Sequence, residues 1–382
     1  MLKGAPDMKQ EISILLVMFL LCALLSGCGA RNAAPAPGEQ VQSIAAEASR
    51  ANSAADRAQK SPPENAPAQA APEETVELEE TLLVTTTVVS NGTDDQNGLD
   101  LIVYTCDRDT LELQQLFRKK INATYPANTV DFEHGIFYFA DADEERLYDN
   151  LYAYDLLTGE TTQLTDGKFA FDDLLMVDGQ LYANAAREYC NAEQPARFDT
   201  GKKTFTYRNE NDDDTFHASF SYDRYEDAFL IMTFQISEQR THRVAAETHI
   251  TPKTISWLSK DFQTVTPVFF TEDFEINLTR RLDKTHILMT TEPYMTGKRT
   301  LKMLDIETQE VADVDIPGIL QVYLFYPARD ENTIFLIGQN TLPSWQLYRY
   351  ELDTQTLTQV EFPETPRQIV DLQLTYQPGS KD

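Results

Sequence analysis

Recognisable catalytic signatures are missing from this sequence. It contains no G-x-S-x-G, H-E-x-x-H or C-x-x-C motif, no glycine-rich phosphate loop and no S-x-D-x-G-x-x-W box of the sialidase kind. Its five histidines are scattered, and His242 and His249, which share one segment, are better explained as solvated side chains than as metal ligands. The motifs therefore point to no particular enzyme.

Positive charge is also scarce. Lys and Arg number 32 against 61 Asp and Glu, which gives a formal net charge of −29. Such a surface repels nucleic acid and anionic lipid headgroups, so the folded part is not expected to bind either. Helical patterns are lacking as well, which argues against the two α/β lobes of a substrate-capturing transport protein.

What is present begins with a three-part N-terminus. Lys3 and Lys9 precede an almost unbroken apolar run over 12–25, and Leu25-Ser26-Gly27-Cys28 follows it. An apolar core of this length between basic and small residues predicts a signal peptide over 1–27 rather than a spanning helix. The L-S-G-C stretch resembles the bacterial lipobox, which implies that Cys28 is acylated and becomes the mature N-terminus. We therefore expect a lipid anchor in the cell membrane, with the protein on the extracytoplasmic side; an ordinary signal peptide or an uncut anchor is the alternative.

Residues 28–74 have the composition of a disordered linker. Fifteen Ala and six Pro occur within 29–72, without a single aromatic residue. A segment of this kind cannot bury enough apolar surface to offset the entropy lost on ordering. As a flexible coil it reaches on the order of 35–40 Å, which clears the lipid headgroups.

The remaining chain, 75–378, contains a repeated hairpin. Each copy has an acidic residue at its fifth position, Thr at its eighth and Leu or Val at its last, with alternating apolar residues on both sides of a polar turn. This pattern predicts antiparallel strands. The four best copies are 103–116, 151–164, 301–314 and 347–360.

A second hairpin precedes each copy, so the repeating unit holds four strands, A to D, at intervals of about 44–48 residues in most cases, as in a propeller blade. The first unit lacks a strand A, because 81–89 serves as its strand B, whereas 367–376 forms an orphan strand after the last unit. If these two segments pair, an all-β, six-bladed β-propeller closes on its C-terminal strand and leaves no open edge. Counting 231–244 as a further hairpin gives seven blades, and a pair of β-sandwiches is the other alternative.

In one copy of the hairpin a strand leads into Tyr154-Asp155, Thr158-Gly159-Glu160 follows after two further residues, and a second strand ends in Leu164-Thr165. This copy resembles a motif of the TolB-like and WD40-like propellers, including secreted ones in bacterial lipoproteins. The resemblance covers roughly 75–378. It implies a fold and little about function, because such propellers host many activities. In those proteins the Asp and Thr belong to the hairpin turn, so we expect Asp155 to be structural.

Neither a metal nor a cofactor is predicted with a defined site. Acidic clusters over 141–145 and 209–214 would suit Ca²⁺, but both lack the central Gly and terminal Glu of an EF-hand loop, and solvated loop charge explains them as well. Cys106 falls in a predicted strand and Cys190 in a loop. A disulfide between them therefore stays open, with two free thiols favoured.

Loop lengths single out one face for a ligand. The B–C loops are long whereas the A–B and C–D turns are short, and long loops on a rigid scaffold are where function concentrates. That face is acidic with a few aromatics, which suits a cationic peptide, a glycan or a basic protein partner; solvated, variable loops are the alternative. The candidate ligand-binding residues are Tyr189, Tyr294, Trp345, Asp141, Asp143, Asp212, Asp213 and Asp214.

These observations favour a binding or scaffold module on a membrane-anchored lipoprotein. A carbohydrate-active or lyase-type propeller enzyme and a sensor domain for a membrane partner are the alternatives. No catalytic residue is predicted.

Overall fold

The computed structural model describes residues 78–89, 99–123, 126–145, 147–167, 169–245, 250–292, 298–340 and 345–378. All of them belong to one compact unit, Pro72–Asp382. The predicted signal peptide, Cys28, the whole predicted linker and Tyr294 lie outside the described residues. No helix among the described residues is long and apolar enough to cross a membrane.

The described chain is built almost entirely of β-strands. One sheet joins the two ends of the domain in the order β24, β1, β2, β3. Its strands are β1 (Leu78–Val89), β2 (Leu99–Cys106), β3 (Leu113–Ile121) and β24 (Gln368–Pro378).

The next sheet consists of two four-stranded units connected through a single pairing, Asp149 with Phe169. The first unit is β4 (Asn128–Asp131), β5 (Ile136–Ala142), β6 (Asp149–Asp155) and β7 (Thr161–Gln163). The second unit is β8 (Phe169–Val177), β9 (Gln180–Arg187), β10 (Gln194–Asp199) and β11 (Thr204–Tyr207).

Three further four-stranded antiparallel sheets follow in sequence order. The first is β12 (Thr215–Asp223), β13 (Ala228–Gln235), β14 (Lys253–Ser259) and β15 (Val265–Thr271). The second is β16 (Glu275–Arg281), β17 (His286–Glu292), β18 (Thr300–Asp305) and β19 (Val311–Val314). The third is β20 (Gln321–Pro327), β21 (Thr333–Gln339), β22 (Gln346–Glu351) and β23 (Thr356–Gln359).

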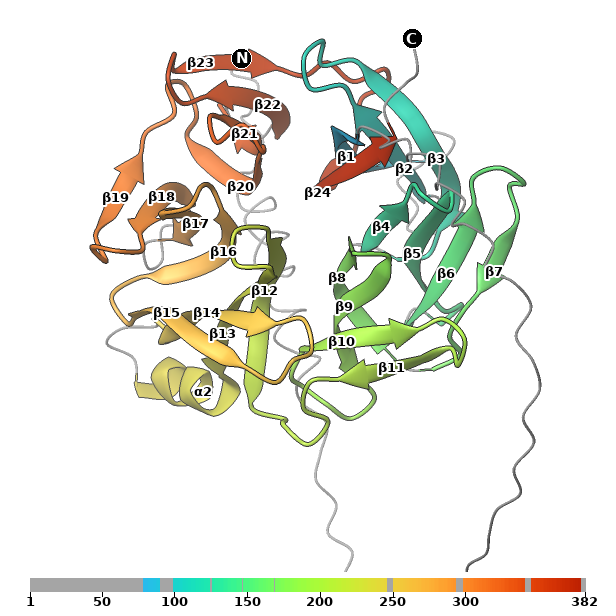
Figure 1. The fold of residues 1–382 in the computed structure, drawn as a ribbon, viewed down its shortest axis with the longest axis horizontal. Coiled ribbons are helices and arrows are strands. Elements are labelled where there is room, and N and C mark those ends of the chain that lie inside the picture. The colour runs from blue at the N-terminus through green and yellow to red at the C-terminus, as the bar shows by residue number, and fades with distance from the viewer. Residues whose placement is uncertain are drawn as a thin grey trace, which may run out of the picture. The chain divides into compact units, whose positions relative to one another are not determined.

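The sheets are arranged around a central axis like the blades of a propeller (Figure 1). The first strand of each unit lies nearest the axis, and these inner strands contact one another in succession, β4 with β8, β8 with β12, β12 with β16, β16 with β20 and β20 with β24. The propeller-like, all-β arrangement predicted from the repeat is confirmed, and a pair of β-sandwiches is excluded.

The core lies between the faces of neighbouring sheets. Leu101 and Val103 of β2 pack with Phe137 and Phe139 of β5, and the ring of Phe117 stands 4.5 Å from that of Phe137. β2 and β5 therefore present apolar faces to each other, which is why large side chains recur at every second position along them.

The acidic residue of the repeat forms the C–D turn, as expected. Asp155 Oδ1 accepts hydrogen bonds from the backbone N–H groups of Leu157 (2.9 Å) and Thr158 (2.8 Å), and Asp107 and Asp305 do the same in their own turns. The turn then needs a residue with positive φ, which Gly159 supplies at 76°.

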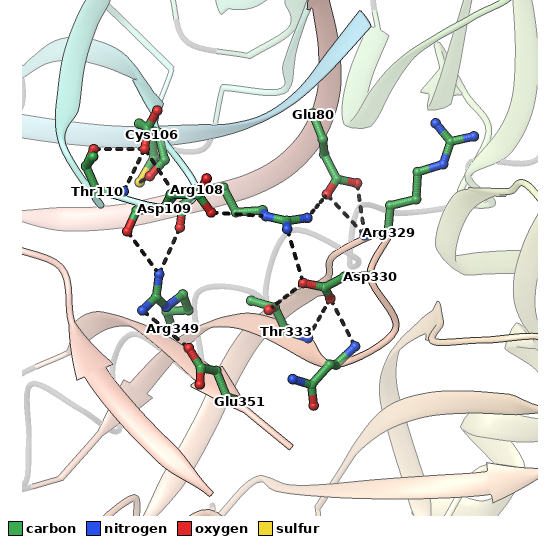
Figure 2. Close-up of polar contacts among 12 residues, drawn as sticks. Glu80, Cys106, Arg108, Asp109, Thr110, Arg329, Asp330, Thr333, Arg349 and Glu351 are labelled. Carbon is green, nitrogen blue, oxygen red and sulfur yellow. Dashed lines mark hydrogen bonds and ion pairs between the residues drawn. The ribbon is translucent and has the colours of Figure 1, made fainter. Parts of the chain in front are cut away.

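The two chain ends meet in the first sheet. β24 pairs antiparallel with β1 from Leu78↔Pro378 to Thr87↔Gln368, so the orphan strand lies beside 81–89 as the sequence indicated. Side chains also connect this sheet to the last one (Figure 2). The Arg108 guanidinium lies 3.4 Å from Glu80 and 3.5 Å from Asp330, and Arg349 donates to the Arg108 carbonyl at 3.0 Å.

One sequence-based expectation needs correction. The sequence showed no helical pattern, but the B–C connection after β13 contains the helix α2 (Ile236–Ala245). The helix begins where Asp214 accepts hydrogen bonds from the Ser237 backbone N–H and hydroxyl, both at 2.7 Å, which satisfies its first turn. Because β13 runs directly into α2, the hairpin at 231–244 that a seventh blade required does not form.

Candidate functional site

The described candidate residues do not converge on one site. Tyr189 is 92% exposed, whereas Trp345 is 37% exposed and its ring lies 5.7 Å from that of Tyr323. Asp141 is buried and accepts hydrogen bonds from the backbone N–H groups of Asn122 (2.8 Å) and Ala123 (3.1 Å). The predicted aromatic residues thus lie apart from the most buried predicted carboxylate.

The other predicted carboxylates also hold loop backbone in place. Asp143 accepts from the N–H of Leu147, Asp213 from that of Asn191, and Asp212 from those of Asp214 and Thr215, all at 2.8–3.0 Å. Asp214 caps α2. Their enrichment in these loops therefore has a structural explanation, and none of them lines the central cavities described next.

Five inner strands carry a β-bulge at the same level. In each one the pairing with the neighbouring strand skips a single residue: Asp172 in β8, Ala218 in β12, Asn277 in β16, Tyr323 in β20 and Val370 in β24. A bulge re-aims the side chain of the unpaired residue, and bulges are common next to binding sites.

All five bulged residues line one cavity on the axis. Its volume is about 400 Å³, and its other lining includes Asp173, Asp371 and Arg299. The lining residues come from the early part of the inner strands, so the cavity opens on the side of the B–C and D–A loops, the face that the sequence favoured. We call it the acidic mouth, defined by Asp172, Asp173 and Asp371.

Burial shifts the pKa values of these carboxyl groups upward. The pKa of Asp371 is raised to about 7 by burial, with Arg280 opposing the shift. Burial, together with the neighbouring Asp172 carboxylate, raises the pKa of Asp173 well above its ordinary value, and burial also raises that of Asp172. Asp172 lines the cavity on the axis, and its side chain is exposed there. The ionised forms of these three carboxyl groups are therefore less stable in the acidic mouth than they would be in water.

A fourth carboxyl group belongs to the same electrostatic cluster. Burial, followed by repulsion from Asp172 and Asp173, raises the pKa of Glu193 well above its ordinary value. Its neighbour Asn184 is fully buried and donates to the His217 carbonyl at 2.7 Å, while its Oδ1 has no hydrogen-bond partner among the described residues. Buried polar groups thus continue behind the acidic mouth.

Arg280 separates the acidic mouth from a second cavity further along the axis, because it lines both. It is only 7% exposed, and its Nη1 donates to Ser219 Oγ (3.2 Å) and to the Thr279 carbonyl (2.9 Å). Its Nε has no partner among the described residues. A buried charge so incompletely hydrogen-bonded is a feature of sites that receive a ligand as well as of structural ion networks.

The second cavity, of about 410 Å³, lies on the side of the A–B turns. Four arginines and three tyrosines contribute to its lining, with Glu80 as the one lining carboxylate. The axis therefore has two mouths of opposite character. We call this one the arginine mouth, defined by Arg224, Arg280, Arg281 and Arg329.

A larger hollow, about 560 Å³, lies off the axis around Glu80, Asp107, Arg108 and Asp109. Its charged groups are already paired with one another and with the last sheet (Figure 2). We therefore assign it to the joint between the first and last sheets rather than to a ligand.

Among the described residues, no group of three or more His, Cys, Asp and Glu side chains has an arrangement that could hold a metal ion. Cys106 and Cys190 are both free thiols, and burial raises the pKa of the Cys106 thiol to about 12, which makes it unreactive.

The cavity opens on the face that the sequence favoured, but none of the residues that line it was among the predicted site residues. Asp172 and Asp173 lie in β8 and Asp371 lies in β24, and in both strands the acidic residues interrupt a largely apolar segment. Carboxylates within such a segment were the available signal. It was obscured by the 61 acidic residues of the chain.

Neither the family models nor the curated protein sequences compared with this chain give a match. Among solved structures, a chain of Kuenenia stuttgartiensis hydrazine synthase is similar in fold, with a TM-score of 0.55 and 12% identity over 79% of this chain. The present chain spans 48% of the length of that chain. TolB from Acinetobacter baumannii gives a TM-score of 0.47 and 12% identity, covering 78% of this chain and 67% of TolB. At these identities the likeness concerns the fold alone.

Proposed function

We propose that this chain is an exported lipoprotein, held in the cell membrane through acylated Cys28, whose propeller binds a ligand at its acidic mouth. The basic, apolar and small zones of residues 1–28 support export and anchoring. The Ala- and Pro-rich segment that follows supports a tether between the lipid and the propeller.

The propeller is inferred to have six blades, with the first blade built from both chain ends. The two four-stranded units that share the Asp149–Phe169 pairing count as separate blades, because a single residue pair connects them. Two contacts between β4 and the sheet that contains β1 and β24 support closure of the ring. Thr129 of β4 donates to Gln373 of β24 at 2.7 Å, and Thr85 of β1 bonds to Asn128 at 3.1 Å.

The five aligned bulges are the observation that carries the proposed site. A bulge interrupts backbone pairing, so its repetition at one level of five inner strands is not needed to build the sheets. Its shared consequence is that the five unpaired residues line a single cavity of about 400 Å³. That volume lies in the range of small-ligand pockets, roughly 300–1,000 Å³.

The chemistry of the acidic mouth favours a cationic group. Crowded carboxylates raise one another's pKa, and a positive charge among them stabilises their ionised forms. A Lys or Arg side chain of a peptide or of a protein partner fits this requirement. Tyr323, with Trp345 beside it, adds an aromatic surface for the aliphatic part of such a side chain.

Calorimetric titration of the purified chain with tetralysine, tetraglutamate and a neutral tetrasaccharide tests this proposal. We expect tetralysine to bind, to bind more weakly as salt is added, and to release protons, because the bound cation lowers the raised pKa values. Asp172→Asn and Asp371→Asn should each weaken binding about tenfold, as expected for a lost charge-assisted contact.

Glu307→Gln is the matched control. Glu307 lies exposed in the C–D turn after β18, so this variant removes the same charge away from the mouth. Binding of tetralysine with equal affinity in all three variants, or a preference for tetraglutamate, would contradict the assignment of the site.

A carbohydrate-active or lyase-type enzyme is the second candidate. The observation that favours it is Asp371, whose pKa of about 7 suits a general acid or base at neutral pH and which lies among other carboxylates. Release of oligosaccharides from a polysaccharide panel, abolished by Asp371→Asn and retained by Glu307→Gln, would support this function over simple binding.

A further inference from the structure

The arginine mouth concentrates positive charge in a chain of the opposite sign. Four of the 32 basic residues of a protein with a net charge of −29 line this one cavity. They come from three A–B turns or adjoining strand ends of β12, β16 and β20, so the ring arrangement, not sequence proximity, brings them together. Three tyrosines, Tyr222, Tyr225 and Tyr326, complete much of the lining.

Aromatic rings hold the guanidinium groups in fixed positions. The Arg224 guanidinium lies 4.7 Å from the ring centre of Tyr225 and donates to the Tyr225 hydroxyl at 2.7 Å. Arg281 lies 5.5 Å from the same ring, and Arg280 lies 5.4 Å from that of Tyr326. Guanidinium groups placed in this way lose little further freedom when an anion binds.

Arg224 and Arg280 have no ion-pair partner among the described residues. Arg224 donates hydrogen bonds to the Tyr225 hydroxyl and the Arg329 carbonyl, and Arg280 donates to the Ser219 hydroxyl and the Thr279 carbonyl. Arg281 has carboxylates only at 3.7 Å (Asp223) and 3.8 Å (Glu226), beyond hydrogen-bonding distance. Arg280 and Arg281 are 7% and 8% exposed, and the Nε of each has no hydrogen-bond partner within the described part of the chain. Such buried positive charge is stabilised by an anion in the adjoining space.

The acidic groups at the rim are already engaged. Glu80 accepts the Arg329 backbone N–H at 3.0 and 3.1 Å and pairs with Arg108 (Figure 2). Asp223 accepts the Trp257 indole N–H at 2.9 Å, and Glu331 accepts the Tyr225 hydroxyl at 2.5 Å. These bonds leave the carboxylates less able to neutralise the arginines.

We propose that the arginine mouth is a second binding site, which takes a small anion bearing carboxylate or phosphate groups. Arginine presents paired N–H donors that match both kinds of group. The cavity of about 410 Å³ accommodates a ligand of several carboxylates or a single phosphate ester. The site adjoins the acidic mouth, with which it shares Arg280, but its ligand carries the opposite charge.

Titration of the purified full chain with citrate and with inorganic phosphate tests this site and distinguishes the two chemistries. We expect at least one of the two anions to bind, and Arg224→Gln to weaken its binding about tenfold, the loss expected for one hydrogen bond between charged groups. Arg224 is chosen because it is half-buried and has no ion-pair partner among the described residues, so its replacement by Gln should leave the fold intact. A thermal melt of the variant checks that point.

Two controls keep the outcome specific. Arg240→Gln removes the same charge from exposed α2 and should leave anion binding unchanged. Asp371→Asn should not weaken anion binding, which separates this site from the acidic mouth. Absence of binding for both anions, or equal affinity in Arg224→Gln and Arg240→Gln, would overturn the proposal.

Discussion

Replacing Asp371 by Asn should change how the stability of the domain depends on pH. The pKa of Asp371 is raised from an ordinary value of 3.8 to about 7, chiefly by burial. Between these two values the folded state holds the Asp371 proton while the unfolded state releases it. The free energy of unfolding contributed by this group therefore falls as pH rises through that window.

The size of the effect follows from the shift. Each unit of pKa difference corresponds to about 1.4 kcal/mol, so the penalty from Asp371 grows by about 2 kcal/mol between pH 5 and pH 7 and levels off above pH 7. Asp371→Asn cannot ionise and escapes this penalty. Its stability relative to the unchanged chain should therefore increase by about that amount over the same interval.

Urea unfolding at pH 5, 6, 7 and 8, followed by intrinsic fluorescence, measures this difference. Any packing or hydrogen-bonding effect of the new amide is the same at every pH, so only the slope reports the titration. Glu307→Gln, on an exposed turn, should give a flat difference. Parallel profiles for Asp371→Asn and the unchanged chain would refute the reasoning and place Asp371 in contact with bulk water.

Three further predictions concern the fold and the anchor. Deleting 368–382 removes all of β24, including the buried Ile369 and Leu372. Because each buried aliphatic side chain contributes about 2–5 kcal/mol, thermal melting should show loss of most of the stability of the domain. Deleting 29–70 should leave the melting temperature unchanged. Asp214→Ala removes the side chain that caps the start of α2, so urea unfolding should show a free energy of unfolding lower by about 1 kcal/mol. Tetralysine binding should be unchanged. A loss of that binding would place the predicted loop carboxylates in the binding site. Cys28→Ala should move the protein from the membrane pellet to the soluble fraction, and continued pelleting at unchanged levels would rule out the lipid anchor.

Local chemistry explains why much of the fold could be predicted. The alternation of apolar residues fixes strands, and the Asp and Thr of each C–D turn make hydrogen bonds within three residues, so these features are readable without any long-range contact. The orphan strand could be paired with 81–89 because an unpaired edge at each end of a ring is unfavourable. The helix α2 was missed because its short sequence has no strong apolar face and depends on the Asp214 cap from a preceding loop.

The proposed binding sites could not be predicted in the same way. The sequence by itself predicted export with a lipid anchor, the strand repeat and the face with long loops. Only the tertiary structure decided which charges meet. Asp172 and Asp371 lie about two hundred positions apart and share a cavity because β8 and β24 both border the axis, and a bulge turns Asp172 inward. Charge clustering on the axis is a property of ring closure, in which residues distant in sequence become neighbours, and no local pattern encodes it.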